Sequence, residues 1–296
     1  MTLDKIKNWL RLVRLPNLFT IPGDVFIGFF LATGGHYAGR GKDLFLLVII
    51  SLCIYAGGII LNDYCDIEKD AKKAPKRPLP SGAISKTTAL IAIILLFIIS
   101  LVTASSISLP TLLITSLLYL FIVFYNLWAK KIPVLGSIIM GCCRGLNVFL
   151  GASLFVEFFH KLVFTAALYE ALYILIVTFL ARNERKKLPK KFTAFFPVFV
   201  GLTLFAVLVK LIAIPSLFFL LFIFWITGIC FRLSEEQNLQ KVPEYIGRLL
   251  RALIIYQVCW LFILIPMCNI DAFICAWILL FMYPISSLIS KHIASS

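Results

Sequence analysis

The chain has 296 residues, 61% of them hydrophobic, and its mean hydropathy of +1.00 lies far above that of soluble proteins. Composition therefore excludes a soluble globular domain and predicts an all-α integral membrane protein. The formal net charge is +14, from 28 Lys and Arg against 14 Asp and Glu, a balance that by itself would also suit a nucleic-acid-binding protein.

Long apolar segments recur along the whole chain, each able to cross the roughly 30 Å hydrocarbon core of a bilayer as a helix. They predict a bundle of nine or ten transmembrane helices in a single domain, residues 1–296. Pro22 and Asp24 interrupt the first apolar segment, which is expected to be a retained first helix preceded by an interfacial one. The expected spans cover residues 17–34, 44–62, 88–106, 110–128, 133–156, 162–181, 192–210, 213–231, 249–268 and 271–289.

The positive charge is concentrated in alternate connections between these spans. With ten spans and a cytoplasmic amino terminus, most Lys and Arg fall on the inner side. The outer connections hold Arg40, Lys42, Lys161 and Lys210, and Arg144 lies within a span. This asymmetry follows the positive-inside rule. Topology therefore explains the charge, and nucleic acid is excluded as a partner.

The stretch NDYCDIEKDAKKAPKRPLPSG, residues 62–82, follows directly on the second span. If the helix continues, Asp63, Asp66 and Asp70 share one face, and Asn62 lies on the same face. Clustered carboxylates repel one another unless a cation lies between them, and Mg²⁺ prefers oxygen ligands. All four residues are therefore candidate metal ligands and catalytic residues.

Basic residues follow the acidic ones in a loop that three prolines stiffen. Acidic and basic groups at one membrane surface suit a magnesium-bound diphosphate. Spacing alone leaves a plainer alternative open, in which the stretch is a juxtamembrane charge cluster that only fixes topology. The bases are Lys69, Lys72, Lys73, Lys76 and Arg77.

The segment GGIILNDYCDIEKDAKKAPKRPLPSGAIS resembles the first motif of the UbiA superfamily of intramembrane prenyltransferases, N-D-x-x-D-x-x-x-D followed by an R-P-L-P-S-G stretch. Weaker similarities in RLVRLPNLFTIPGDVFIG, YNLWAKKIPVLG and MGCCRGLNVFLGAS extend the resemblance over most of the chain. The last of these, with IYAGGIILND, most resembles the EboC-type subgroup, which implies the cytoplasmic membrane of a bacterium.

The resemblance implies an all-helical bundle, open sideways to lipid, that binds an isoprenyl diphosphate and Mg²⁺ under its cytoplasmic face. The isoprenyl group would pass to a polar acceptor, aromatic or otherwise. Position by position, the resemblance implies that Asn62, Asp63 and Asp66 bind metal and diphosphate and that Asp70 supports them. It implies further contacts to the diphosphate from Arg77, Tyr125 and Lys130, and the basic run after the aspartates adds Lys73.

The second Asp-rich motif of that superfamily is expected after the sixth span, where this chain reads VTFLARNERKKLPKKF. Two interpretations are open. Either the basic side chains replace a second metal as diphosphate ligands, or the site is degenerate and the protein is a non-catalytic lipid-diphosphate binding or transport protein. The first is favoured because the first motif is complete. It makes diphosphate ligands of Arg182, Asn183, Glu184 and Lys186.

Three ionisable residues, Asp24, Arg144 and Glu170, fall near the centres of predicted spans. Each would be costly alone in lipid, so they are expected to face the bundle interior. Arg144 should pair with Asp24 or Glu170, with Asn147 on the same face. The group is either an ion pair that orients helices or a polar cavity floor that orients the acceptor or accepts its proton.

Overall fold

The computed structural model describes residues 3–34, 39–155, 161–183, 191–212, 214–264 and 270–292, and every regular element in them is helical. Residues 3–183 contain α1 (Leu3–Leu12), α2 (Leu15–Leu18), α3 (Pro22–Ala32), α4 (Gly41–Cys65), α5 (Ile67–Lys73), α6 (Lys86–Ile107), α7 (Leu109–Leu127), η1 (Ala129–Lys131), α8 (Pro133–Ala152) and α9 (Lys161–Asn183). The rest of the chain contains α10 (Lys191–Ala194), α11 (Phe196–Ile212), η2 (Ile214–Phe218), α12 (Phe219–Glu235), α13 (Val242–Phe262) and α14 (Ile270–His292).

Nine helical segments in the described parts of the chain are long and apolar enough to cross a membrane, with α2 and α3 counted together. The shorter α11 is a further apolar helix. The predicted all-α membrane bundle of nine or ten spans is therefore confirmed. The predicted seventh span, 192–210, corresponds to α11, which starts later than expected because α10 ends at Ala194 and α11 begins at Phe196.

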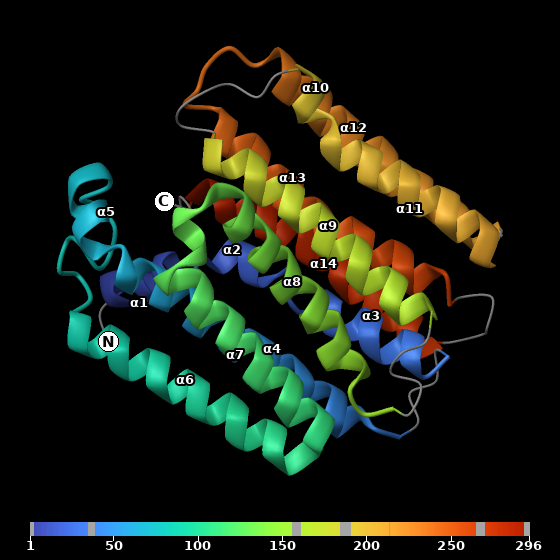
Figure 1. Cartoon of the computed structure of the whole chain (residues 1–296), viewed down its shortest axis with the longest axis horizontal. Coiled ribbons are helices and arrows are strands. Elements are labelled where there is room, and N and C mark those ends of the chain that lie inside the picture. The colour runs from blue at the N-terminus through green and yellow to red at the C-terminus, as the bar shows by residue number, and fades with distance from the viewer. Residues whose placement is uncertain are drawn as a thin grey trace.

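The long helices run side by side in one bundle (Figure 1). α6 and α7 form one edge, and the α11–α12 hairpin forms the opposite edge. α5 stands off one end of the bundle, and both labelled chain ends lie at that end. The part of the aspartate motif that lies on α5 is thus carried beyond the apolar body of the protein, where a charged segment can meet water.

Prolines divide the first span into two helices. Pro16 and Pro22 lie in the first turns of α2 and α3, where a missing amide hydrogen costs little. Arg14, just before α2, has a left-handed backbone conformation with φ 50°. Its side chain contacts Asp63 of α4, so this turn joins the first span to the aspartate motif.

Glycines allow α3, α8 and α9 to approach closely. A β-carbon on Gly28 of α3 would lie 1.9 Å from the Val148 carbonyl oxygen of α8. One on Gly145 of α8 would lie 2.8 Å from the Ala167 carbonyl oxygen of α9. Small residues at helix contacts bring backbones together in membrane bundles. Here they bring three helices close enough for their buried polar side chains to meet.

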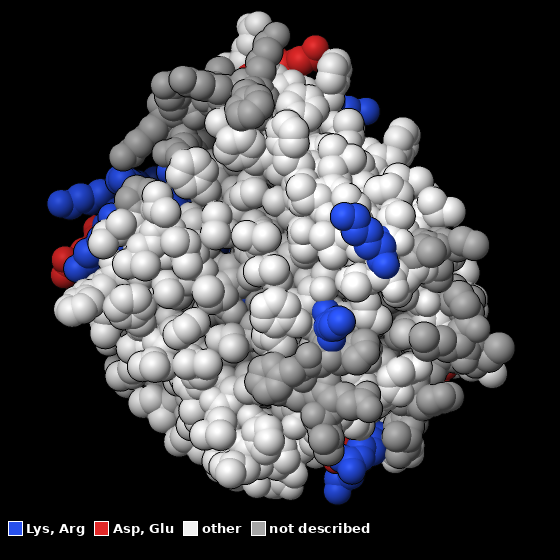
Figure 2. Space-filling view, turned by 45° about the vertical axis from the view of Figure 1, so that its right-hand side comes forward, with Lys and Arg blue, Asp and Glu red and all other residues white. Residues whose placement is uncertain are grey.

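The outer surface of the bundle is apolar. Large hydrophobic side chains such as Leu109, 66% exposed, point away from the bundle. Figure 2 shows a broad face whose described residues are mostly uncharged, with Lys, Arg, Asp and Glu gathered mainly at its margins. Such a surface suits lipid and not water, and the chain is a multi-pass integral membrane protein.

Candidate active site

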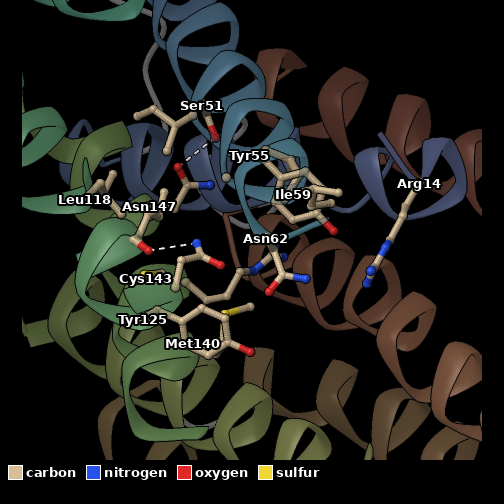
Figure 3. A pocket seen from close by; sticks show the side chains of 16 residues that line it. Arg14, Ser51, Tyr55, Ile59, Asn62, Leu118, Tyr125, Met140, Cys143 and Asn147 are labelled. Carbon is tan, nitrogen blue, oxygen red and sulfur yellow. Dashed lines mark hydrogen bonds between the residues drawn. The ribbon is translucent and has the colours of Figure 1, made fainter. Parts of the chain in front are cut away.

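A cavity of about 160 Å³ lies between α4, α7 and α8 (Figure 3). Most of its wall is apolar, and Tyr55 and Tyr125 add aromatic rings. A space of this kind excludes water from a reacting group. The apolar wall is formed mainly by Ile54, Ile59, Leu118, Ile122, Met140 and Cys143.

Polar side chains line both ends of the cavity. Arg14 and Asn62 line the end at which α4 terminates, and we call this end the rim. Ser51, Arg144 and Asn147 line the other end, which we call the floor. Asn62 and Ser51 lie about 16 Å apart along α4, since an α-helix rises about 1.5 Å per residue. The cavity therefore connects the aspartate motif to the charges inside the bundle.

Asp63 lies beside the rim with 4% of its surface exposed. Its Oδ1 accepts a hydrogen bond from Arg14 Nη2 at 3.1 Å and a longer one from Asn62 Nδ2 at 3.4 Å. A buried carboxylate needs a cation or donors to offset its desolvation. Arg14 supplies that cation. The sequence had indicated Arg14 only as one of the inner positive charges, so its place in the site was missed.

Asp66 marks a bend after α4. It lies between Cys65, the last residue of α4, and Ile67, the first of α5, with φ −101° and ψ 9°. Asp66 Oδ1 lies 3.1 Å from Lys130 Nζ of η1 and 3.9 Å from Lys69 Nζ. The predicted unbroken helical stripe of aspartates is therefore wrong, because the helix is interrupted at the middle aspartate.

Asp70 pairs with a base that follows it in the sequence. Its Oδ2 accepts a hydrogen bond from Arg77 Nη1 at 2.6 Å, and both side chains are largely buried. Lys73, at the end of α5, is exposed. Each aspartate of the motif thus has its own basic partner, and the three carboxylates do not converge. In the described residues no three Asp, Glu, His or Cys side chains form a group that could hold a metal.

Asn62, Asp63 and Asp66 still fit a magnesium diphosphate. Mg²⁺ in such sites takes one or two carboxylates, while phosphate oxygens and waters complete its coordination shell. Asn62 lines the cavity, and each of the two carboxylates is already neutralised by a side-chain cation, Arg14 or Lys130. This donor set therefore suits Mg²⁺ together with a bound phosphate, and not a cage made of protein ligands alone.

The start of the predicted second motif reaches η1 beside the rim. Arg182, near the end of α9, donates a hydrogen bond from Nη2 to the Lys130 carbonyl oxygen. Arg182 thus supports the residue whose ammonium group pairs with Asp66. Asn183 ends α9, and Glu184 and Lys186 lie outside the described residues.

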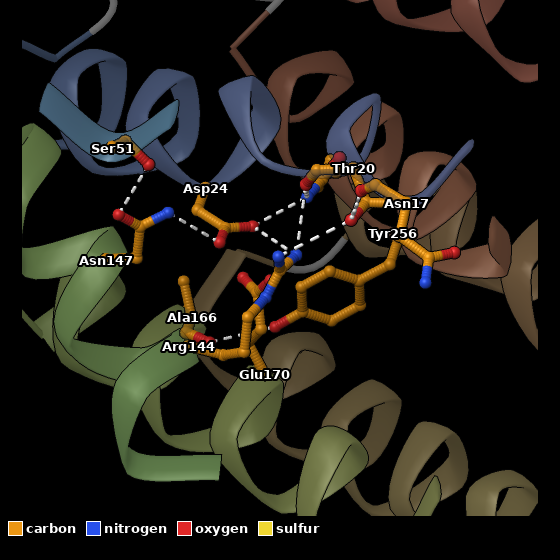
Figure 4. Close-up of polar contacts among 10 residues, drawn as sticks. Asn17, Thr20, Asp24, Ser51, Arg144, Asn147, Ala166, Glu170 and Tyr256 are labelled. Atoms are coloured by element: carbon orange, nitrogen blue, oxygen red, sulfur yellow. Dashed lines mark hydrogen bonds and ion pairs between the residues drawn. The ribbon is translucent and has the colours of Figure 1, made fainter. Parts of the chain in front are cut away.

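The floor of the cavity belongs to a buried ion-pair cluster (Figure 4). Arg144 Nη2 lies 2.9 Å from Asp24 Oδ1 and 3.2 Å from Glu170 Oε1, and both acidic residues are 0% exposed. Asn147 Nδ2 donates to Asp24 Oδ2 at 2.8 Å. Ser51 Oγ donates to Asn147 Oδ1 at 2.7 Å. The predicted pairing of Arg144 is confirmed, with both carboxylates as partners.

Gln257 of α13 joins this cluster, although the sequence analysis did not single it out. Its Nε2 donates to Asp24 Oδ1 and to the Thr20 carbonyl oxygen, both at 2.7 Å. Arg144 Nη2 donates to the same carbonyl oxygen at 3.0 Å. The sequence did contain a signal for Gln257: its amide side chain lies inside the apolar segment 249–268, and a buried polar group needs hydrogen-bond partners.

We compared the chain with known protein families, and the match is consistent with the rim, cavity and floor described above. Residues 24–242 match the family described as the UbiA prenyltransferase family. The chain belongs to this family. The match includes the whole aspartate motif and the floor residues from Asp24 to Glu170, so the family predicted from residues 62–82 is confirmed.

Curated relatives match part of this UbiA-family chain. Digeranylgeranylglyceryl phosphate synthase of Sulfurisphaera tokodaii is 32% identical over 152 residues, which are 51% of this chain and 54% of that protein. The enzyme of the same name from Methanoculleus marisnigri is 30% identical over 183 residues, 62% of this chain and 61% of that protein. The chain thus spans about half the length of the curated relatives it matches.

Solved structures share the UbiA fold over more of the chain. An apo UbiA homolog from Aeropyrum pernix K1 has a TM-score of 0.65 at 18% identity, covering 81% of this chain and 94% of that one. A UbiA homolog from Archaeoglobus fulgidus bound to GPP and Mg²⁺ has a TM-score of 0.54 at 17% identity, covering 83% and 98%. These likenesses establish the fold.

Proposed function

We propose that this UbiA-family chain transfers an isoprenyl group from an isoprenyl diphosphate to a polar acceptor inside the membrane, with Mg²⁺. The order of groups along the cavity carries the proposal: acids and bases at the rim, apolar walls, and a polar floor. This order suits a donor whose charged head stays at the membrane surface while its chain lies in a dry cavity.

The rim is the proposed diphosphate site. Asn62, Asp63 and Asp66 would hold Mg²⁺, which when bound neutralises the charge that grows on the leaving diphosphate. Arg14 and Lys130 pair with the two carboxylates in the present structure. On donor binding these two bases can turn to phosphate oxygens as the carboxylates turn to the metal, so that each charge keeps a partner.

Further diphosphate contacts are proposed around the rim. Tyr125 lines the cavity, and Arg182 contacts η1, whereas Arg77 is held by Asp70. Asp70 therefore acts in this proposal by fixing the loop that carries Arg77. The full proposed set is Arg77, Tyr125, Lys130, Arg182, Asn183, Glu184 and Lys186, with exposed Lys73 as a weak outer contact that solvent screens.

The reaction breaks the bond between C1 of the donor and the diphosphate oxygen, and the diphosphate leaves with the electron pair. The acceptor forms the new bond to C1 and releases a proton. Asp24 and Glu170 are fully buried behind Arg144 and Asn147, so in this proposal they hold these two side chains in place to orient the acceptor. The departing diphosphate or water at the rim takes the proton. The relatives are digeranylgeranylglyceryl phosphate synthases, so a prenylated glyceryl phosphate is the first acceptor to test, and an aromatic one the second.

Subgroup and orientation are also part of the proposal. Similarity in IYAGGIILND and MGCCRGLNVFLGAS supports the EboC-type subgroup, and with it the cytoplasmic membrane of a bacterium. The excess of Lys and Arg in alternate connections supports an amino terminus and a rim on the cytoplasmic side.

Diphosphate release tests the proposed reaction. Purified full-length protein is given labelled geranyl or geranylgeranyl diphosphate and each acceptor, with Mg²⁺ or with a chelator. Release should need both Mg²⁺ and Asp66, so Asp66→Asn should lose it. Asp43→Asn, which changes an acid at the opposite end of α4, should keep it.

The same assay decides between enzyme and carrier. Mg²⁺-dependent donor binding without release, for every donor length and acceptor, would overturn the transferase proposal. That outcome would favour the non-catalytic lipid-diphosphate carrier that the basic second motif leaves open.

A further inference from the structure

A second pocket, of about 980 Å³, lies between α12, α13 and α14, away from the cavity of the candidate active site. Its charged lining is predominantly basic, whereas in the cluster behind the cavity floor two carboxylates share one guanidinium group. Such a site in a membrane bundle indicates an anionic ligand. The polar and aromatic lining includes Arg232, Glu244, Arg248, Arg251, Tyr283 and Ser287.

Arg251 is the buried base of this pocket. Only 7% of its surface is exposed, and its guanidinium lies over Gly247, where a β-carbon would be 3.4 Å from Nη1. No described residue accepts a hydrogen bond from it. Its guanidinium nitrogens face the pocket and are not sealed from it, so an anion bound there can accept hydrogen bonds from them.

The pocket keeps a positive charge after its internal pair is counted. Arg248 Nη2 pairs with Glu244 Oε1 at 2.7 Å and lies over the Tyr245 ring. Arg232 at the end of α12 is exposed, so it and Arg251 carry charge that the single acid of the lining does not balance. Two guanidinium groups can each present paired N–H donors to phosphate oxygens.

The position of the pocket selects a lipid over a water-soluble anion. The connection between α12 and α13 lies at the same end of the bundle as α5, which places the pocket near the same membrane face as the rim (Figure 1). Arg251 lies about 14 Å along α13 from Val242, within the membrane-crossing helix. Phe224, 77% exposed, and Phe231, 53% exposed, line the same pocket. Acyl chains can lie against these rings while the head group reaches the arginines.

We propose that this pocket binds the phosphate head group of an anionic phospholipid. Basic pockets between membrane helices on the cytoplasmic side are suited to such head groups. The Trp225 and Tyr283 rings meet edge to face at 5.5 Å and join α12 to α14 across the pocket. The lipid would therefore hold α12, α13 and α14 together. This site goes beyond the proposed transferase reaction and does not depend on it.

Native mass spectrometry of the purified full-length protein tests the site. Increasing phosphatidylglycerol or phosphatidylcholine is added in mild detergent, and the bound lipids are counted. Wild type should retain phosphatidylglycerol preferentially, and Arg251→Gln should weaken that binding about tenfold, as expected for loss of one charge-assisted contact. Lys241→Gln, an exposed basic residue just before α13, is the matched control and should bind as wild type does.

Two results would overturn the proposal: equal retention of the two lipids by wild type, or undiminished phosphatidylglycerol binding in a folded Arg251→Gln protein. Inorganic diphosphate and geranyl diphosphate are added to the lipid-loaded protein in a second arm. Neither should displace the lipid, and displacement by either would assign the pocket to a soluble or prenyl diphosphate instead.

A second variant covers the case in which Arg251→Gln does not fold. Arg232 is exposed, so Arg232→Gln should fold and lower phosphatidylglycerol binding about threefold, less than loss of the buried base. Unchanged binding in Arg232→Gln, with Arg251→Gln unfolded, would count against the site.

Discussion

The rim and the floor of the cavity neutralise their carboxylates in different ways. At the rim each carboxylate has its own basic partner: Asp63 has Arg14, and Asp66 has Lys130. At the floor Arg144 serves both Asp24 and Glu170, and amide side chains complete the contacts of Asp24. The rim pairs are buried less completely than the floor acids: Arg14 and Asp66 keep part of their side-chain surface exposed, whereas Asp24 and Glu170 have none.

This difference separates groups that can exchange partners from groups that cannot. A single ion pair at the edge of the cavity can open when a ligand offers new partners to both of its charges. A buried network that joins five helices is costly to break, because its members have no water to replace a lost partner. The rim is therefore suited to capture a charged head, and the floor to hold its shape.

Loss of the shared cation at the floor should have the largest effect on stability. Arg144→Met leaves two buried carboxylates without their shared cation, so the free energy of unfolding should fall by about 3–5 kcal/mol. Thermal unfolding in detergent measures this. Lys42→Met, at the exposed start of α4, is the control and should change little. A floor variant as stable as wild type would show that the cluster is not a structural network.

Loss of a rim carboxylate should affect activity far more than stability, and it should destabilise the protein less than Arg144→Met does. Asp63→Asn keeps the shape but removes a proposed metal ligand, and turnover should fall by about 100-fold. Diphosphate release and thermal unfolding are measured on the same preparation. If stability falls as far as in Arg144→Met, the contrast between rim and floor is wrong.

Loss of the basic partner of Asp63 should separate metal binding from donor binding. Arg14→Gln frees the carboxylate, so Mg²⁺ alone should bind more tightly, while the isoprenyl diphosphate, which loses a phosphate contact, should bind about tenfold more weakly. Calorimetric titration with each ligand measures both changes. Parallel weakening of the two ligands would contradict an exchange of partners at Arg14.

The smallest effect is expected at the edge of the motif. Lys73 is exposed at the end of α5, and Lys73→Gln should change donor affinity less than about twofold, because solvent and salt screen an exposed charge. The same titration at two salt concentrations checks this. A tenfold loss would mean that α5 folds over the bound diphosphate and that the rim extends beyond the present cavity.

Much of the fold and of the floor could be predicted from sequence because lipid leaves few choices. Apolar segments must become helices, and a charge such as Arg144 must find partners inside the bundle. Which partners it finds depends on packing: Gly28 and Gly145 let α3 and α9 approach α8, so both acids reach one guanidinium. The spacing of residues along the sequence does not indicate how closely these helices pack.

The rim was less predictable for the opposite reason. Helical spacing placed the three aspartates on one stripe, but water and nearby bases compete for carboxylates at a membrane surface. The bend at Asp66, and pairing with Arg14, Lys130 and Arg77, gave each aspartate its own cation. Arg14 and Lys130 are distant in sequence from the aspartates they contact, so periodicity could not indicate them.

A structure determined with Mg²⁺ and a non-cleavable isoprenyl diphosphate analogue would show whether the rim captures the diphosphate by an exchange of partners. The diphosphate should lie at the rim, with Asp63 and Asp66 on the metal, Arg14 and Lys130 turned to phosphate oxygens, and the Arg144 cluster unchanged. A diphosphate bound elsewhere, or at the rim with the Arg14–Asp63 and Lys130–Asp66 pairs intact, would contradict this exchange.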